Sequence, residues 1–160
     1  MKHIVGVADM KISCSSGDVL VTHALGSCLG VAVHDPVAVI GGLLHIMLPQ
    51  ASINPEKAQS NPFMFVDSGV PAFFHHLYAA GAVKARCVVS VAGGGNINGG
   101  DSDRFAIGKR NHLMLRKLLW KNGILVKAED VGGTAPRTMY LEVGTGRTWL
   151  STAGQERQLQ

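Results

Sequence analysis

A pair of adjacent strand-like segments constrains the fold of this chain most strongly. Residues 31–34 and 39–47 are rich in aliphatic and β-branched residues, and the turn dipeptide Asp35-Pro36 separates them. We therefore predict an antiparallel hairpin with a two-residue loop flanked by Asp35 and Ala38. That register would place Cys28 directly opposite His45 on one face, whereas a slip of one residue would put them on opposite faces.

The rest of the chain alternates short strand-like runs with two helical patterns. Strands are predicted at residues 4–7, 19–22, 87–91, 124–128, 138–143 and 147–150, and helices from Asp67 or Ser68 to about Ala80 and from Gly108 to Asn122. Residues 50–62 are predicted to form a mobile surface loop. Strand groups interrupted by so few helices favour an α+β layered sandwich of mixed β-sheet, with about two to three helices packed outside, over a doubly wound fold.

The length and the cysteine content set further limits. A chain of 160 residues is expected to form a single domain over residues 1–150, followed by a polar, disordered tail at 151–160. Cys14, Cys28 and Cys87 lack paired spacing, which argues against a disulfide framework or a zinc site and fits a reducing cytoplasm. No apolar run is long enough for a membrane helix, so we expect no direct membrane insertion.

The net charge of +4 and the pI of about 9.2 are compatible with an acidic partner. The densest basic group comprises Lys109, Arg110, Arg116, Lys117 and Lys121. A solvated helix face explains this group most simply, while an acidic protein surface is the more plausible partner. Aromatic residues are too sparse for a nucleic-acid-binding face.

Cys28 stands in Gly26-Ser27-Cys28-Leu29-Gly30, and its thiolate would be a nucleophile if His45 held the ion pair or took the proton. The flanking glycines would let a substrate amide approach the sulfur. Main-chain N–H groups of Gly26, Ser27 and Cys28 are candidate oxyanion donors, that of Cys28 first among them. A small buried cysteine and a hydrogen-bonded core histidine are the alternatives that involve no chemistry.

Three other features suggest chemistry less strongly. Thr22 could orient the imidazole of His45, although spacing alone indicates this weakly and an ordinary strand threonine is the simpler interpretation. The loop from Gly93 to Asp101 lacks the pattern of a phosphate-binding loop, and Asp101 and Asp103 would repel phosphate. His75 and His76 are adjacent on a predicted helix and therefore face different directions, which indicates surface residues rather than metal ligands.

Five short motifs follow one another along the chain. They are Thr22-His23-Ala24-Leu25-Gly26-Ser27-Cys28, His45-Ile46-Met47-Leu48-Pro49, Ala92-Gly93-Gly94, Ile107-Gly108-x-Arg110-Asn111 and Glu129-Asp130-x-Gly132-Gly133. Together they resemble the chemoreceptor glutamine deamidase family, CheD, over about residues 2–150. The resemblance implies an α/β sandwich related to cysteine deamidase toxins, with Cys28, His45 and Thr22 as the catalytic residues.

The same resemblance implies an activity and its partners. The implied reaction is hydrolysis of glutamine side-chain amides on methyl-accepting chemotaxis receptors, which gives glutamate and ammonia without a metal or organic cofactor. Some family members also bind CheC, a phosphatase of the response regulator. A binding module that regulates such a phosphatase with little catalysis is therefore the alternative function, and esterase action on receptor methylglutamates would use the same acyl-enzyme chemistry.

Overall fold

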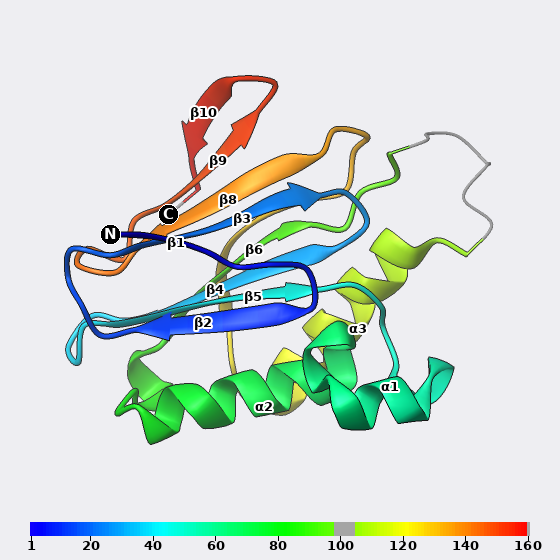
Figure 1. Cartoon of the computed structure of the whole chain (residues 1–160), viewed down its shortest axis with the longest axis horizontal. Helices are drawn as coiled ribbons and strands as arrows, with labels where there is room; N and C mark the ends of the chain where they lie inside the picture. Colours follow the sequence, from blue (N-terminus) through cyan, green and yellow to red (C-terminus); the bar gives the residue numbers. More distant parts are fainter. Residues whose placement is uncertain (98–104, 160) are drawn as a thin grey trace.

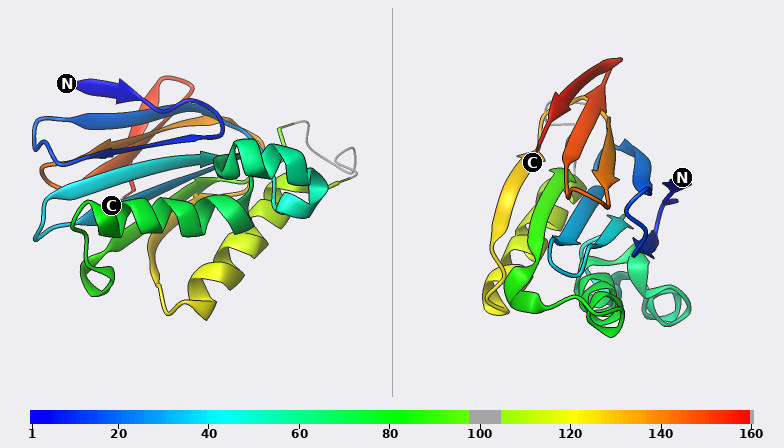
Figure 2. Two further views of the ribbon diagram at one scale, coloured as in Figure 1. Left: turned by 60° about the horizontal axis from the view of Figure 1, so that its bottom comes forward. Right: turned by 90° about the vertical axis from the view of Figure 1, so that its left-hand side faces the viewer.

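Two five-stranded sheets stack face to face, and helices cover the outer face of one of them (Figure 1, Figure 2). The structure is a computed structural model and describes residues 1–97 and 105–159. Sheet A has the order β1 (Lys2–Ile4), β3 (Val19–Leu25), β8 (Arg137–Glu142), β9 (Thr148–Thr152), β10 (Gln155–Gln158). Sheet B has the order β2 (Asp9–Ser13), β5 (Ile40–Ile46), β4 (Leu29–Asp35), β6 (Val88–Gly93), β7 (Val126–Val131).

Both sheets are mixed. The pairs β1–β3 and β6–β7 are parallel, and the other described strand pairs are antiparallel. The helices are α1 (Pro55–Ser60), α2 (Val66–Ala79) and α3 (Ile107–Lys121), with short 3-10 turns at Ala51–Ile53, Pro62–Met64 and Lys84–Arg86. The predicted α+β sandwich of mixed sheet is therefore confirmed.

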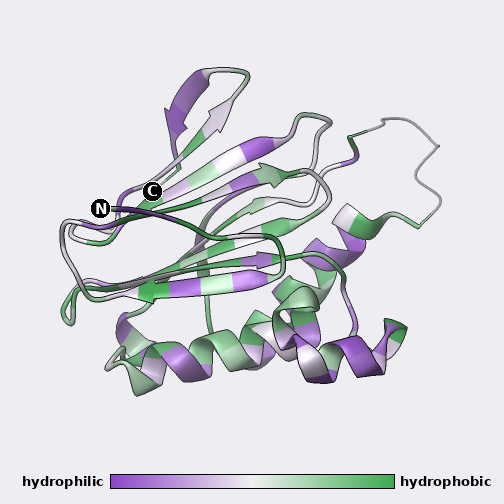
Figure 3. Ribbon diagram, viewed as in Figure 1, coloured by the Kyte–Doolittle hydropathy of each residue, from purple (hydrophilic) through white to green (hydrophobic). Residues whose placement is uncertain are grey.

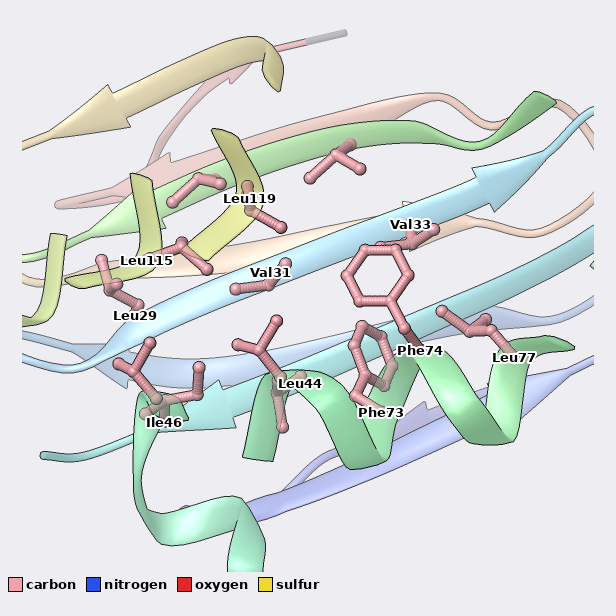
Figure 4. Close-up of a cluster of buried hydrophobic side chains, with 14 of the residues drawn as sticks. Leu29, Val31, Val33, Leu44, Ile46, Phe73, Phe74, Leu77, Leu115 and Leu119 are labelled. Atoms are coloured by element: carbon pink, nitrogen blue, oxygen red, sulfur yellow. The ribbon is translucent and has the colours of Figure 1, made fainter. Parts of the chain in front are cut away.

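The three layers enclose two apolar cores. One core lies between the sheets and contains Leu20, Leu43 and Leu141. The other lies between sheet B and the helices, where Leu44 lies beside Phe73 of α2 (Figure 4). Residues of α3 belong to the same cluster. Because sheet B is covered on both sides, every residue of β4 and β5 is buried, and these strands lack the alternation of a half-exposed sheet.

The hairpin exists, but its predicted register is wrong. Gly30, rather than Cys28, pairs with His45, and a four-residue loop joins Asp35 to its partner Ile40. The carboxylate of Asp35 accepts hydrogen bonds from the N–H groups of two loop residues, at 3.0 and 3.1 Å, and this turn geometry sets the longer loop. The shift of two residues puts Cys28 just before β4, outside the paired strand. An even shift does not by itself exchange the two faces of a strand.

Two predictions of irregular chain are also wrong. Residues 50–62 contain one 3-10 turn, α1 and the start of a second 3-10 turn. Asn54 and Asn61 cap the two helical segments that begin with a proline. Hydrophilic residues dominate α1 in Figure 3, and no residue of that helix is buried. The expected disordered tail contains the end of β9 and the whole of β10, which pairs antiparallel with β9.

The long helices were predicted more accurately. Helices α2 and α3 match the predicted ranges to within two residues, although Phe65 rather than Asp67 or Ser68 occupies the N-cap of α2. Strand β2 was not predicted, and it pairs with β5 at the edge of sheet B. The glycine-rich segment that starts at Gly93 is described as far as Ile97, and its remainder falls in residues 98–104, which lie outside the described residues.

Candidate active site

The site lies where the chain crosses from sheet A to sheet B. Strand β3 ends at Leu25 in sheet A and β4 begins at Leu29 in sheet B, so residues 26–28 form the crossing. Cys28 is partly exposed and packs against the core between the sheets. His45, on β5, lies two residues from Leu43, whose side chain belongs to the same core. Both candidate residues therefore point to the space between the two sheets.

Thr22 links the histidine to sheet A. Its Oγ1 lies 2.7 Å from Nδ1 of His45 and 2.8 Å from the carbonyl oxygen of Val5. A carbonyl can only accept, so the single hydroxyl proton of Thr22 is donated to Val5 and the hydroxyl oxygen accepts from Nδ1–H. This assigns the tautomer of neutral His45, in which Nε2 carries the free lone pair.

Nε2 of His45 is the open end of this chain of hydrogen bonds. It is buried and has no hydrogen-bond partner among the described residues. Burial disfavours the imidazolium and lowers the pKa of His45 from 6.5 to about 4. His45 is therefore a neutral, oriented base near neutral pH, and its lone pair is available to a proton donor within the site.

Burial acts on the thiol in the opposite sense. It raises the pKa of Cys28, while the nearby main-chain N–H of the same residue lowers it by a smaller amount. The two resting groups are therefore a neutral thiol and a neutral imidazole, rather than the thiolate assumed from the sequence, and no hydrogen bond joins the thiol to His45 Nε2. Such a cysteine becomes nucleophilic when a base removes its proton during attack.

The carbonyl groups of the crossing are all held from within the protein. The carbonyl oxygens of Gly26 and Cys28 accept from the N–H groups of Gly95 and Gly94 at 2.8 and 2.9 Å. That of Ser27 accepts from a side chain of α3. In the described part of the chain the N–H groups of Ser27 and Cys28 have no carbonyl partner, so they remain candidate oxyanion donors. The N–H of Gly26 is no longer a candidate, because it donates to the carbonyl oxygen of Ala24.

The two flanking glycines have a packing role that the sequence did not reveal. A Cβ at Gly30 would lie 2.8 Å from the sulfur of Met139 and 2.9 Å from a methyl of Leu25. A Cβ at Gly26 would lie 2.8 Å from the side chain of Ile97. Protein side chains therefore occupy the positions that side chains at residues 26 and 30 would need, so glycine is required for packing at both places.

Gly93 supports the crossing directly. It has φ of +110°, and a Cβ there would lie 2.1 Å from the carbonyl oxygen of Cys28. Substitution Gly93→Ala should lower the free energy of unfolding by about 2–4 kcal/mol, from backbone strain plus overpacking. Gly123→Ala is a matched control, because Gly123 has φ of +70° but open space around it.

Urea denaturation of both variants measures the difference. The control should lose only about 1–2 kcal/mol, the cost of a left-handed conformation for alanine. Equal losses in the two variants would mean that Gly93 does not need to approach the Cys28 carbonyl so closely.

The lowered pKa of His45 predicts an unusual pH dependence. A general base acts only when unprotonated, and this form dominates above the folded-state pKa of about 4. The kcat/KM for the reaction at Cys28 should therefore stay constant as the pH falls through 6.5 and decline only toward pH 4. A pH profile with an acidic midpoint near 6.5, unchanged in His23→Ala, would contradict the lowered pKa.

One polar residue of the site was not assigned a role from the sequence. Asn111 on α3 is fully buried and donates the hydrogen bond to Ser27. It stood in one of the recognised motifs, but no local pattern connected it with Cys28. Among the described residues there is no cluster of three histidine, cysteine or acidic side chains that could hold a metal ion.

A thiol at a sheet crossing, an oriented neutral imidazole and free N–H groups at the same crossing are the groups that a thiol hydrolase requires. Comparison with known proteins agrees, since the model of the family "CheD chemotactic sensory transduction" matches residues 47–152. The chain belongs to the CheD family.

Relatives extend the match to nearly the whole chain. A "Probable chemoreceptor glutamine deamidase CheD" of Solibacter usitatus is 47% identical over 98% of this chain and 92% of its own length. Similarly named proteins of Syntrophus aciditrophicus and Anaeromyxobacter dehalogenans are 45% and 41% identical, each over 94% of both chains. None of the described helices is both long and apolar enough to cross a membrane.

Proposed function

We propose that this protein hydrolyses glutamine side-chain amides of chemoreceptors, which gives glutamate and ammonia. The named relatives support this substrate class. The observation that carries the chemistry is the hydrogen bond from His45 Nδ1–H to Thr22, because it leaves Nε2 as a free base on the same face as the Cys28 thiol.

The proposed reaction has two stages. Nε2 of His45 takes the thiol proton while Sγ of Cys28 attacks the carboxamide carbon, and the N–H groups of Ser27 and Cys28 stabilise the oxyanion. The imidazolium then gives its proton to the leaving nitrogen, so ammonia departs and a thioester remains. Water, deprotonated by His45, hydrolyses the thioester to glutamate and restores the thiol.

The neutral thiol of Cys28 and the neutral imidazole of His45 are the protonation states that these steps require. Thr22 keeps the Nδ1–H oriented throughout, and its hydroxyl stays fixed by donating to the carbonyl of Val5. The low pKa of His45 makes the imidazolium a strong acid, which favours protonation of a poor leaving group such as an amide nitrogen. The chain's own residues supply the nucleophile, the base and the oxyanion donors.

A direct assay tests the function. Purified protein is incubated with cytoplasmic fragments of chemoreceptors, and peptide mass spectrometry follows the conversion of each glutamine to glutamate while a coupled assay follows ammonia. We expect equal amounts of glutamate and ammonia. Conversion of receptor methylglutamate in the same assay would add esterase action, which proceeds through the same thioester.

The receptors are thus proposed as substrate partners, and the cytoplasm as the compartment in which free thiols persist. A CheC-type phosphatase is a further proposed partner. Tight binding of such a phosphatase, with no deamidation of any receptor fragment, would favour the alternative of a regulatory binding module.

A further inference from the structure

We propose that Asn111 is a positioning residue that aims the N–H of Cys28 at the oxyanion and ties this peptide to the strand of the base. The proposal rests on acyl transfer at Cys28, the chemistry of the proposed function. Asn111 lies on the second turn of α3, which is separated from both Cys28 and His45 by more than sixty residues of sequence.

Asn111 holds two main-chain carbonyls at once. Its side-chain Nδ2 donates to the carbonyl of Ser27 at 3.0 Å and to that of Met47 at 2.9 Å. A side-chain amide has two N–H protons, so both are used. One bond reaches the residue before the nucleophile, and the other reaches the second residue after the base.

The bond to Ser27 sets the direction of the proposed oxyanion donor. Each peptide unit is planar, and in a trans unit the C=O of one residue and the N–H of the next point in opposite directions. The chain contains no cis peptide bond among its described residues. Because the carbonyl of Ser27 points toward Asn111, the N–H of Cys28 in the same peptide unit points away from Asn111.

The orientation of the side-chain amide is determined by its surroundings. The Oδ1 atom is buried and has no partner among the described residues, whereas Nδ2 faces two carbonyl oxygens. Exchanging the two atoms would place an acceptor against two acceptors and would leave both carbonyls without donors. The two N–H donors are therefore the functional part of the side chain.

The backbone of Asn111 is held against the same loop. A Cβ at Gly108, one turn earlier on α3, would lie 2.4 Å from the carbonyl oxygen of Gly95. Gly94 and Gly95 donate the other two hydrogen bonds to the crossing. Of the three donors to the carbonyls of residues 26–28, those of Gly94 and Gly95 are main-chain N–H groups and that of Asn111 is a side-chain amide. A substitution can therefore remove the Asn111 donor without removing a main-chain group.

The test compares Asn111→Asp and Asn111→Ser with Leu119→Ala, a control that removes buried volume from the same helix without touching the crossing. Aspartate keeps the shape of asparagine and removes at least one donor. In the deamidation assay, kcat of both Asn111 variants should fall by about 10- to 100-fold, less than outright loss of an oxyanion donor, with KM changed by less than about 3-fold. The control should keep its kcat despite a lower melting temperature.

A second readout separates positioning from general damage. Alkylation of Cys28 by iodoacetamide is a displacement at a saturated carbon and forms no oxyanion, so its rate should change by less than about 3-fold in the Asn111 variants. Alkylation and kcat that fall together would overturn the proposal, as would a kcat that matches the parent protein.

A third measurement does not depend on turnover, and its first part needs only the parent protein. A peptide in which the glutamine carboxamide is replaced by an aldehyde should form a reversible thiohemiacetal with Cys28 in the parent protein. By NMR the amide proton of Cys28 should then shift downfield, and folded Asn111 variants should bind the aldehyde at least about 10-fold more weakly. Adduct formation without that shift would overturn the proposal, and adduct formation without receptor deamidation would instead reject only the proposed substrate.

Discussion

Replacing Cys28 with alanine should abolish conversion of receptor glutamine to glutamate, with a loss in kcat of roughly 10⁴-fold or more. The sulfur is the only group proposed to form a covalent bond with the substrate. Its neighbours would still bind the carboxamide and stabilise the oxyanion, so KM should change much less than kcat. Because Cys28 is only partly buried, the variant should fold with nearly unchanged stability.

The other two cysteines provide matched controls. Cys14 is exposed, and the pKa of Cys87 is raised to about 11, chiefly by burial and also by the nearby carboxylate of Asp35. No histidine is proposed as a base for either cysteine. The variants Cys14→Ala and Cys87→Ala should therefore deamidate receptor fragments at the parent rate. Peptide mass spectrometry measures all three variants, and persistent glutamate formation by Cys28→Ala would rule out the proposed nucleophile.

Replacing His45 with asparagine should lower kcat by about 10²- to 10⁴-fold, the usual contribution of a general acid–base group. Asparagine can place its side-chain N–H where Nδ1 lies and can keep the hydrogen bond to Thr22. It has no atom at the position of Nε2. The variant therefore removes the base while it preserves the contact between the two sheets.

His34→Gln is the control for this second substitution. His34 is also a buried histidine of sheet B, and its Nε2 lies 2.7 Å from the carbonyl oxygen of Val143, a contact that glutamine can reproduce. The alkylation rate of Cys28 near neutral pH, measured beside kcat, should fall in His45→Asn and stay constant in His34→Gln. A normal kcat in His45→Asn would show that another group removes the thiol proton.

Local sequence patterns predicted the layers and most strands because these depend on apolar runs and on turn residues. The hairpin register was missed because it depends on which groups donate hydrogen bonds to the carboxylate of Asp35. Its buried carboxylate accepts from two loop N–H groups, from the N–H of Val83 and from Arg86, and the latter two lie about fifty residues away. A dipeptide pattern contains no information about such distant donors.

The same limit applies to the site. Cys28 and His45 stood out because a thiol between glycines and a histidine in an apolar strand are unusual on their own. The donors that hold residues 26–28 come from Gly94, Gly95 and Asn111, which are brought there by the packing of α3 on the loop after β6. The role of Asn111 depends on tertiary contacts, and spacing along the chain could not predict it.

Trapping of the covalent intermediate tests the central claim most directly. Protein and receptor fragment are quenched with acid during turnover, and the mixture is digested and mapped by mass spectrometry. We predict a thioester that joins the receptor glutamyl group to Cys28, with one ammonia lost, and no adduct in Cys28→Ala. Formation of glutamate by protein whose Cys28 is fully alkylated, or an adduct on any other residue, would contradict the claim.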